Sequence, residues 1–136
     1  MDFVNELRKR GKRITNAREV VCKILETSGH KHFTVEELHK LSLKKDKNID
    51  LATVYRTLEL LENINLIEHS HQVHGSGLYF VKDVHSNIHI VCESCGDISD
   101  LDIKTSKKVN DLITSKTNFR EITNHFIYSG FCKNCK

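Results

Sequence analysis

The sequence predicts an α+β protein, with an N-terminal winged helix-turn-helix domain followed by a small α/β domain. Three observations predict this class. Apolar residues recur at helical spacing in several stretches before residue 63, and a glycine-marked hairpin pattern follows them. The remaining sequence is strand-rich and carries two C-x-x-C motifs. We place the domain boundary near Lys82, so that residues 1–83, with a short hinge at their end, form one domain and residues 84–136 the other.

The composition is that of a globular chain of 136 residues, 38% hydrophobic and 29% charged. That length suffices for one ordinary domain or two very small ones. It contains no apolar run long enough to span a membrane and no apolar core of a signal peptide, so we expect a cytoplasmic protein without membrane contact. Five cysteines in a reducing compartment favour metal binding over disulfides. Cys22 stands apart from the other four, and we expect it to be a small buried hydrophobe.

The first domain is expected to begin with three helices. They cover residues 1–12, residues 15–27 with Thr15 as the cap, and residues 34–42 with a capping box formed by Thr34 and Glu37. A fourth helix is expected at residues 50–62. After it, strands at 66–73 and 78–81 flank a turn at Gly75-Ser76-Gly77. In the second domain we expect strands at 88–92, 98–103 and 119–131, and a helix at 105–115 whose Val109, Leu112 and Ile113 face inward.

The stretch from residue 50 to residue 62 predicts a DNA-recognition helix. Asp50 can cap it, and its apolar stripe consists of Leu51, Val54, Leu58 and Leu61. Polar and aromatic side chains near its N-terminus, away from that stripe, suit the major groove: Thr53, Tyr55, Arg56 and Thr57. Five cations between Arg8 and Arg13 form a basic cluster that, with Arg18, could contact phosphates. A solvated charged turn is the alternative for a lone cluster of this kind.

Four cysteines form the strongest signal in the sequence. Cys92 and Cys95 make one C-x-x-C knuckle, and Cys132 and Cys135 make the second. Two knuckles supply the four sulfurs of a closed, tetrahedral, structural Zn²⁺ site, which has no open position for catalysis. Redox pairs and an iron–sulfur cluster are the alternatives.

Nine histidines and several aspartates suggest a second, mixed nitrogen and oxygen site. His85 and His89 precede the first knuckle, Asp100 follows it, and His32 opens the third helix. A metal that joins His32 to His89 and Asp100 would fix the angle between the two domains. Each histidine taken alone is better explained as a polar surface or core residue.

Several motifs, taken in order, resemble the ferric-uptake-regulator (Fur) family of bacterial metal-dependent repressors across nearly the whole chain. The matching segments are residues 13–18, 32–38, 52–58, 88–96 and 123–125, the last of these preceding Cys132. The resemblance implies a homodimer that binds double-stranded DNA at an inverted-repeat operator, with zinc held by the four cysteines. It also implies a regulatory divalent metal, Fe²⁺ first and Mn²⁺, Zn²⁺ or Ni²⁺ as alternatives.

Carried over by residue, the resemblance assigns the regulatory metal to His32, His89 and Asp100, with His85 and His125 as further candidates. It assigns DNA contacts to Tyr55 and Arg56. The implied function is repression of metal-uptake genes, in which metal binding selects the dimer whose two recognition helices have the correct spacing.

Other functions stay open at this point. A peroxide sensor, in which iron oxidises His32 or His89, and a zinc or nickel sensor belong to the same family. From other classes, a small zinc enzyme lacks any H-E-x-x-H or Cys–His pattern, so we expect no catalysis. A zinc-ribbon interaction module without DNA affinity would not need the predicted recognition helix and hairpin.

Overall fold

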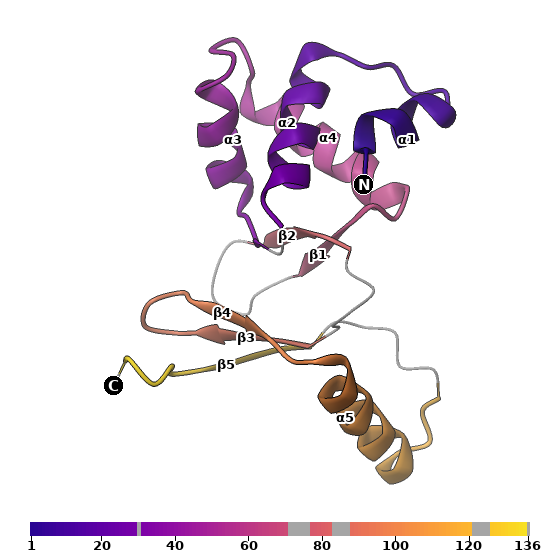
Figure 1. The fold of residues 1–136 in the computed structure, drawn as a ribbon, viewed down its shortest axis with the longest axis vertical. Coiled ribbons are helices and arrows are strands. Elements are labelled where there is room, and N and C mark those ends of the chain that lie inside the picture. Colours follow the sequence, from indigo (N-terminus) through magenta and orange to yellow (C-terminus); the bar gives the residue numbers. More distant parts are fainter. Residues whose placement is uncertain (30, 71–76, 83–87, 121–125, 136) are drawn as a thin grey trace. The chain divides into compact units, whose positions relative to one another are not determined.

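The computed structural model describes residues 1–29, 31–70, 77–82, 88–120 and 126–135. The chain divides into two compact units, Met1–Lys82 and Asp83–Lys136 (Figure 1). The first unit contains the helices α1 (Phe3–Lys9), α2 (Asn16–Thr27), α3 (Val35–Leu43) and α4 (Leu51–Asn63), followed by the antiparallel strands β1 (Ile67–Ser70) and β2 (Leu78–Val81). This order is that of a winged helix-turn-helix, as predicted.

Short polar side chains fix where the helices of the first unit begin. The Thr15 hydroxyl accepts a hydrogen bond from the Arg18 N–H at the start of α2. Thr34 and Glu37 form the predicted capping box at the start of α3, and the Asp50 carboxylate accepts from the Thr53 N–H at 2.7 Å. Each cap satisfies a backbone donor that has no partner within its own helix.

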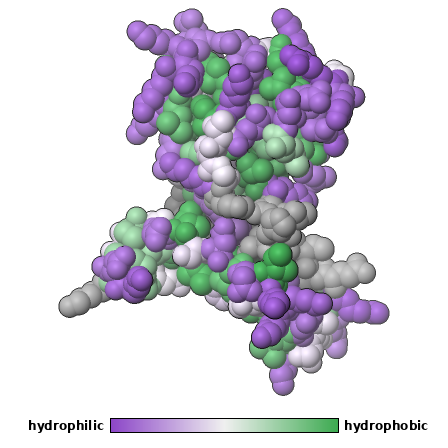
Figure 2. Space-filling model, in the orientation of Figure 1, coloured by the Kyte–Doolittle hydropathy of each residue, from purple (hydrophilic) through white to green (hydrophobic). Residues whose placement is uncertain are grey.

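The core of the first unit lies where the four helices meet the hairpin. It contains fully buried side chains from every helix, among them Phe3, Leu25, Leu38 and Leu58. The lone cysteine, Cys22, is fully buried in this core, as predicted. In the view of Figure 2 the surface of the first unit is mostly hydrophilic, with hydrophobic side chains visible between the hydrophilic ones.

The second unit consists of a three-stranded sheet and one helix. Strand order is β4 (Ile98–Asp100), β3 (Ile88–Cys92), β5 (Phe126–Gly130), and α5 (Ile103–Lys116) lies between β4 and β5 in the sequence. β3 pairs antiparallel with β4 and parallel with β5. Parallel neighbours require a crossover, and α5 belongs to the connection that provides it.

Several sequence predictions fail in detail. The strand expected at 98–103 ends at Asp100, because Asp102 caps α5 by accepting from the Thr105 N–H. Of the strand expected at 119–131, the described part is Phe126–Gly130. Leu112 was expected to face inward and is 59% exposed. On α4, Leu51 is 37% exposed and Thr57 is buried, the reverse of the expected pattern.

In the described residues, none of the helices combines the length and the apolar character that crossing a membrane requires.

Candidate metal centres and DNA-binding surface

The four clustered cysteines come from the ends of two neighbouring strands. Cys92 ends β3, Cys95 follows in the next turn, and Cys132 and Cys135 follow β5. One sulfur from each residue lies within 4.8 Å of all the others. The Cys95 and Cys132 sulfurs are 3.8 Å apart, and four thiolates at Zn–S distances of about 2.3 Å in a tetrahedron would also be about 3.8 Å apart. The predicted quartet therefore assembles with spacing that suits zinc.

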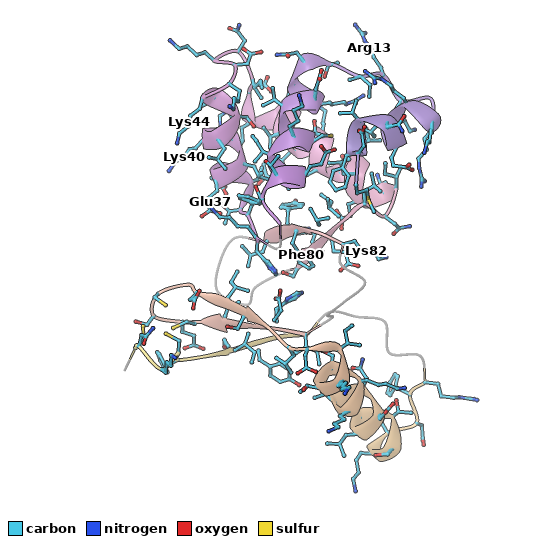
Figure 3. All side chains as sticks on the ribbon, viewed as in Figure 1. Arg13, Glu37, Lys40, Lys44, Phe80 and Lys82 are labelled. Carbon is cyan, nitrogen blue, oxygen red and sulfur yellow. The ribbon has the colours of Figure 1, made fainter. Side chains whose placement is uncertain are left out.

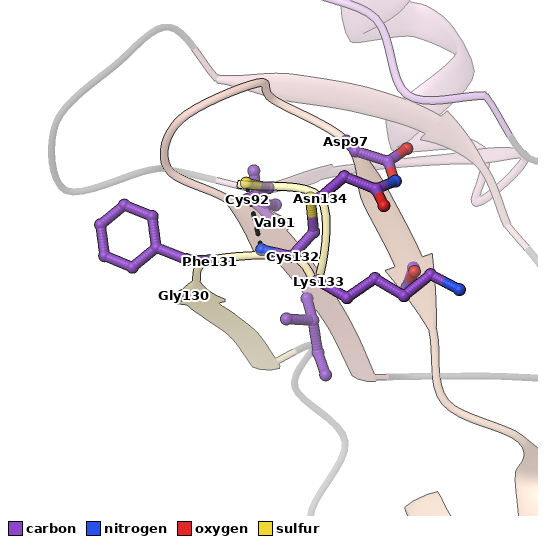
Figure 4. A pocket seen from close by; sticks show the side chains of 10 residues that line it. Val91, Cys92, Asp97, Gly130, Phe131, Cys132, Lys133 and Asn134 are labelled. Carbon is purple, nitrogen blue, oxygen red and sulfur yellow. Dashed lines mark hydrogen bonds between the residues drawn. The ribbon is translucent and has the colours of Figure 1, made fainter. Parts of the chain in front are cut away.

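Backbone hydrogen bonds fix the conformation of each knuckle. The Gly96 N–H donates to the Cys92 carbonyl at 2.9 Å, and Gly96 has φ +74°, a conformation that glycine adopts without strain. The Cys135 N–H donates to the Cys132 carbonyl at 2.9 Å in the second knuckle. Between the knuckles, the Cys132 N–H donates to the Cys92 sulfur at 3.3 Å (dashed line in Figure 4).

The two knuckles are braced by Glu93 and Ser129, whose roles no sequence motif indicates. The Glu93 carboxylate accepts from the Ser129 hydroxyl at 2.7 Å, and the Glu93 N–H donates to the Gly130 carbonyl at 2.8 Å. These contacts join the turn after β3 to the end of β5. They follow from the parallel register of β3 and β5, which the sequence does not reveal.

The thiols of Cys92 and Cys95 differ in pKa. The N–H groups of Cys132 and Cys95 lower the pKa of Cys92 to about 6. The Asp97 N–H acts to lower the pKa of Cys95, but hydrogen bonding to the thiols of Cys92, Cys135 and Cys132, together with desolvation, raises it to about 12. Neighbouring thiolates oppose one another's ionisation, so a cation is needed for all four to be anionic together.

A pocket adjoins the cluster in the second unit. Cys92 and Cys132 line it together with Asp97, Lys133 and Asn134 and the apolar side chains of Ile90 and Phe131 (Figure 4).

A second set of donors lies on the same sheet. His89 of β3 is the register partner of Asp100 of β4, and its Nδ1 is 2.5 Å from the Asp100 carboxylate oxygen. This contact is a hydrogen bond in which the imidazole N–H donates to the carboxylate. An imidazole and a carboxylate together form the mixed donor set that divalent transition metals accept.

His32 lies in the first unit, where it is held by the backbone hydrogen bonds of the next residue and by a ring contact. Phe33 and Tyr79 exchange two backbone hydrogen bonds of 2.9 and 2.7 Å, which attach this segment to β2. The His32 ring stacks on Phe80 with centroids 4.4 Å apart; Figure 3 labels Phe80 on β2. Joint ligation by His32 with His89 and Asp100 remains a prediction. His85 and His125, the other candidate ligands, lie outside the described residues.

The proposed DNA contacts lie on the first unit. Tyr55 is 46% exposed on α4, next to the exposed Arg56, and Thr53 is half-buried. Arg13 is exposed on the connection between α1 and α2 (Figure 3). Arg18 is half-buried, and its guanidinium donates to the Arg13 carbonyl at 2.5 Å. This contact gives Arg18 a role in shaping the basic turn that the sequence did not reveal.

Comparisons with known proteins identify the family of the chain. The ferric uptake regulator family profile matches residues 9–129. The peroxide-responsive repressor PerR of Staphylococcus epidermidis is 34% identical, over 99% of this chain and 89% of the relative.

Two solved structures resemble the fold. The Helicobacter pylori ferric uptake regulator, described as having three functional metal-binding sites, has a TM-score of 0.77 and 28% identity, covering 98% of this chain and 88% of that one. The Campylobacter jejuni peroxide stress regulator has a TM-score of 0.70 and 28% identity, covering 99% of this chain and all of that one. The chain belongs to the ferric uptake regulator family of metal-responsive transcription regulators.

Proposed function

We propose that the protein is a cytoplasmic homodimeric repressor that binds an inverted-repeat operator when a regulatory divalent metal is present, with Fe²⁺ as the first candidate. The observation that carries the proposal is the presence of two chemically different donor sets. Four sulfurs form one set, and a bonded imidazole–carboxylate pair forms the other. Soft thiolates suit a permanent zinc, whereas nitrogen and oxygen donors suit an ion that exchanges.

In this proposal the sulfur site is structural. Cys92, Cys95, Cys132 and Cys135 would hold zinc, which would cross-link the ends of β3 and β5. Closing four protein ligands around one ion leaves no position for substrate, so the site acts on stability and not on chemistry.

The regulatory site would use His89 and Asp100 from the second unit and His32 from the first, with His85 and His125 as further candidates. A divalent ion held there would supply a link between the units. His89 and Asp100 are already in contact across β3 and β4, so they would present one half of the site with little rearrangement. His32, held by its stacking on Phe80, would supply the other half.

DNA recognition would use α4. Tyr55 and Arg56 would contact bases or sugars, Thr53 would lie near them, and Arg13 would contact the backbone. Two-fold symmetry of the dimer would place two such helices on successive half-sites.

Dimerisation would use the second unit. β5 pairs only with β3 among the described strands, so its other edge can accept a strand from a second copy. Apolar side chains are exposed around this sheet and on α5, among them Ile90, Tyr128, Ile103 and Leu112. Binding of a second copy would bury these apolar side chains, which are exposed to water in a single chain of this size.

The deciding experiment is an anaerobic titration of the zinc-loaded dimer with Fe²⁺, Mn²⁺, Zn²⁺ and Ni²⁺, with affinity for a promoter fragment as the readout. We expect one ion to raise the affinity at the lowest free concentration. If affinity is the same with every ion and with none, the repressor mechanism proposed here is wrong.

Peroxide sensing is the second candidate, since a relative that matches nearly the whole chain is a peroxide-responsive repressor. In that case Fe²⁺-loaded protein exposed to peroxide should gain one oxygen on His32 or His89, detected by peptide mass spectrometry, and should release DNA. Mn²⁺-loaded protein is the matched control and should gain none.

A further inference from the structure

Three lysines lie in the connection between α3 and α4, outside the proposed recognition helix. Lys44, Lys45 and Lys47 are all exposed, and Figure 3 shows Lys44 projecting outward where α3 ends. Among the described residues, no carboxylate forms an ion pair with any of the three. Lys44 can stabilise the C-terminal end of α3, but Lys45 and Lys47 lie beyond the helix, so the helix dipole does not account for them.

Hydrogen bonds hold this connection in one conformation. The N–H groups of Lys45 and Asp46 both donate to the Ser42 carbonyl, at 2.9 and 3.0 Å. The His39 ring Nε2 lies 2.8 Å from the Ile49 carbonyl, immediately before the Asp50 cap of α4. The three lysines therefore extend from a braced turn and not from a loose loop.

Asp46, the one acid among these lysines, is directed elsewhere. Its two carboxylate oxygens accept from the Asn16 side chain at 2.6 Å and from the Asn48 N–H at 2.9 Å. The contact with Asn16 joins the turn to the first residue of α2, three positions after Arg13. The basic turn between α1 and α2 and the lysine turn between α3 and α4 are thereby tied together.

The turn also lies next to the part of α4 that reads DNA. It ends at Asp50, and α4 begins at Leu51. When the N-terminus of a recognition helix enters the major groove, the residues just before it lie at the groove edge, which is formed by phosphates.

We propose that Lys44, Lys45 and Lys47 form a phosphate-binding element for the DNA backbone, positioned by the hydrogen bond between Asn16 and Asp46. This proposal rests on the proposed DNA-binding function and adds a second contact surface to it. The element contributes affinity and orientation but no base readout, because ammonium groups on phosphates carry no sequence information.

The test compares two triple variants on a DNA fragment that the wild-type protein selects from a random library. In K44Q/K45Q/K47Q, the slope of log affinity against log salt should become shallower by about 5, since the variant dimer lacks six lysines and each phosphate contact contributes about 0.9. The ratio of affinities for selected and scrambled DNA should not change. The control, K104Q/K107Q/K108Q on α5, removes the same charge and should leave the slope unchanged.

Equal slope changes in both triple variants would show that only the net charge of the protein matters, and this would overturn the proposal. An unchanged slope in K44Q/K45Q/K47Q would also overturn it. A wild-type protein that selects no sequence under any metal would instead refute the proposed function.

Asn16 is a positioning residue in this proposal, and a double-mutant cycle tests that role. Asn16→Ala should weaken DNA binding and make the salt slope shallower in the wild-type background. In the K44Q/K45Q/K47Q background the same change should have no further effect on the slope. If Asn16→Ala has the same effect in both backgrounds, it does not act through the lysines and this part of the proposal fails.

Discussion

Cys22 and the four clustered cysteines show how burial and neighbours set the chemistry of one residue type. Cys22 has no exposed surface, and desolvation raises its pKa to about 12. Cys95 lies exposed among three other sulfurs. The sequence alone allowed this distinction, because Cys22 has no cysteine nearby and falls beside an apolar helical stripe.

Thiol labelling should therefore divide the cysteines into two groups. In zinc-loaded protein at pH 8, we expect N-ethylmaleimide to modify none of the five at an appreciable rate. After a chelator removes the metal, Cys95, Cys132, Cys135 and Cys92 should react, while Cys22 should stay protected because its thiol remains buried and protonated. Mass spectrometry of peptides measures the outcome, and denatured protein labelled at all five positions is the control.

The cap of α4 makes a pH-dependent contribution to stability. Hydrogen bonds from the Thr53 hydroxyl and N–H lower the pKa of Asp50 below its ordinary value. The folded state thus favours the carboxylate, so its contribution is complete above the unfolded-state pKa of about 3.9 and is lost as the pH falls through the folded-state value.

Asp50→Ala should accordingly destabilise the protein at pH 7, and the difference from wild type should shrink as the pH falls below about 4. Urea unfolding across this range measures it. Asp50→Asn is the matched control, since its side-chain oxygen keeps a cap without the charge. A constant difference between Asp50→Ala and wild type at every pH would contradict the assignment.

At the scale of the element, apolar periodicity predicted the helices well and the end of β4 poorly. Val54, Leu58 and Leu61 of α4 are fully buried, as the stripe predicted. The stretch from Ile98 to Ile103 was expected to be one strand, but capping by Asp102 starts a helix and the strand ends at Asp100. A local hydrogen bond from the Asp102 cap competes there with strand formation, and the positions of the apolar residues alone do not decide which prevails.

The buried stripe of α4 should dominate the stability of the first unit. Leu58→Ala should cost about 2 to 5 kcal/mol, because it removes a fully buried side chain from a packed core. Leu51→Ala is the control on the same helix, and its cost should be smaller, since Leu51 is 37% exposed. Chemical denaturation followed by circular dichroism compares the two, and equal costs would show that burial along α4 is misassigned.

For the whole molecule, the sequence predicted both donor sets but not their supports. The cysteine spacing alone predicted the cluster of four sulfurs, because each knuckle is complete within four residues. The Glu93–Ser129 contact depends on the pairing of strands far apart in the sequence. Likewise, the short contact between His89 and Asp100 follows from the β3–β4 register, which no motif encodes.

The two donor sets should respond differently to mutation. Cys92→Ser should unfold the second unit and leave the helical content of the first, because it breaks the cross-link between strand ends. His89→Ala should preserve both units but abolish the metal-stimulated part of DNA binding. Circular dichroism and gel shifts measure these outcomes, and equal loss of fold in both variants would contradict the separation of structural and regulatory roles.

Dimer formation should depend on the exposed face of the second unit. Tyr128→Asp should shift the protein toward monomer in analytical ultracentrifugation, because it places a charge on an apolar face that a second copy would cover. Tyr55→Asp is the matched control, since both tyrosines are 46% exposed. That variant should remain dimeric and lose DNA affinity, and a monomeric Tyr55→Asp would place the interface elsewhere.

The cysteine cluster joins strand ends that are forty residues apart, whereas most helix–helix contacts in the first unit are between helices adjacent in the sequence. Contacts between residues close in the sequence form faster than contacts between distant residues, so the first unit should fold early and the second unit late. With zinc bound at the cysteine cluster, as proposed, chains made in a cell short of zinc would have a folded first unit and an unfolded second unit, and they would not dimerise. The supply of one metal would thereby limit how many copies exist to sense another.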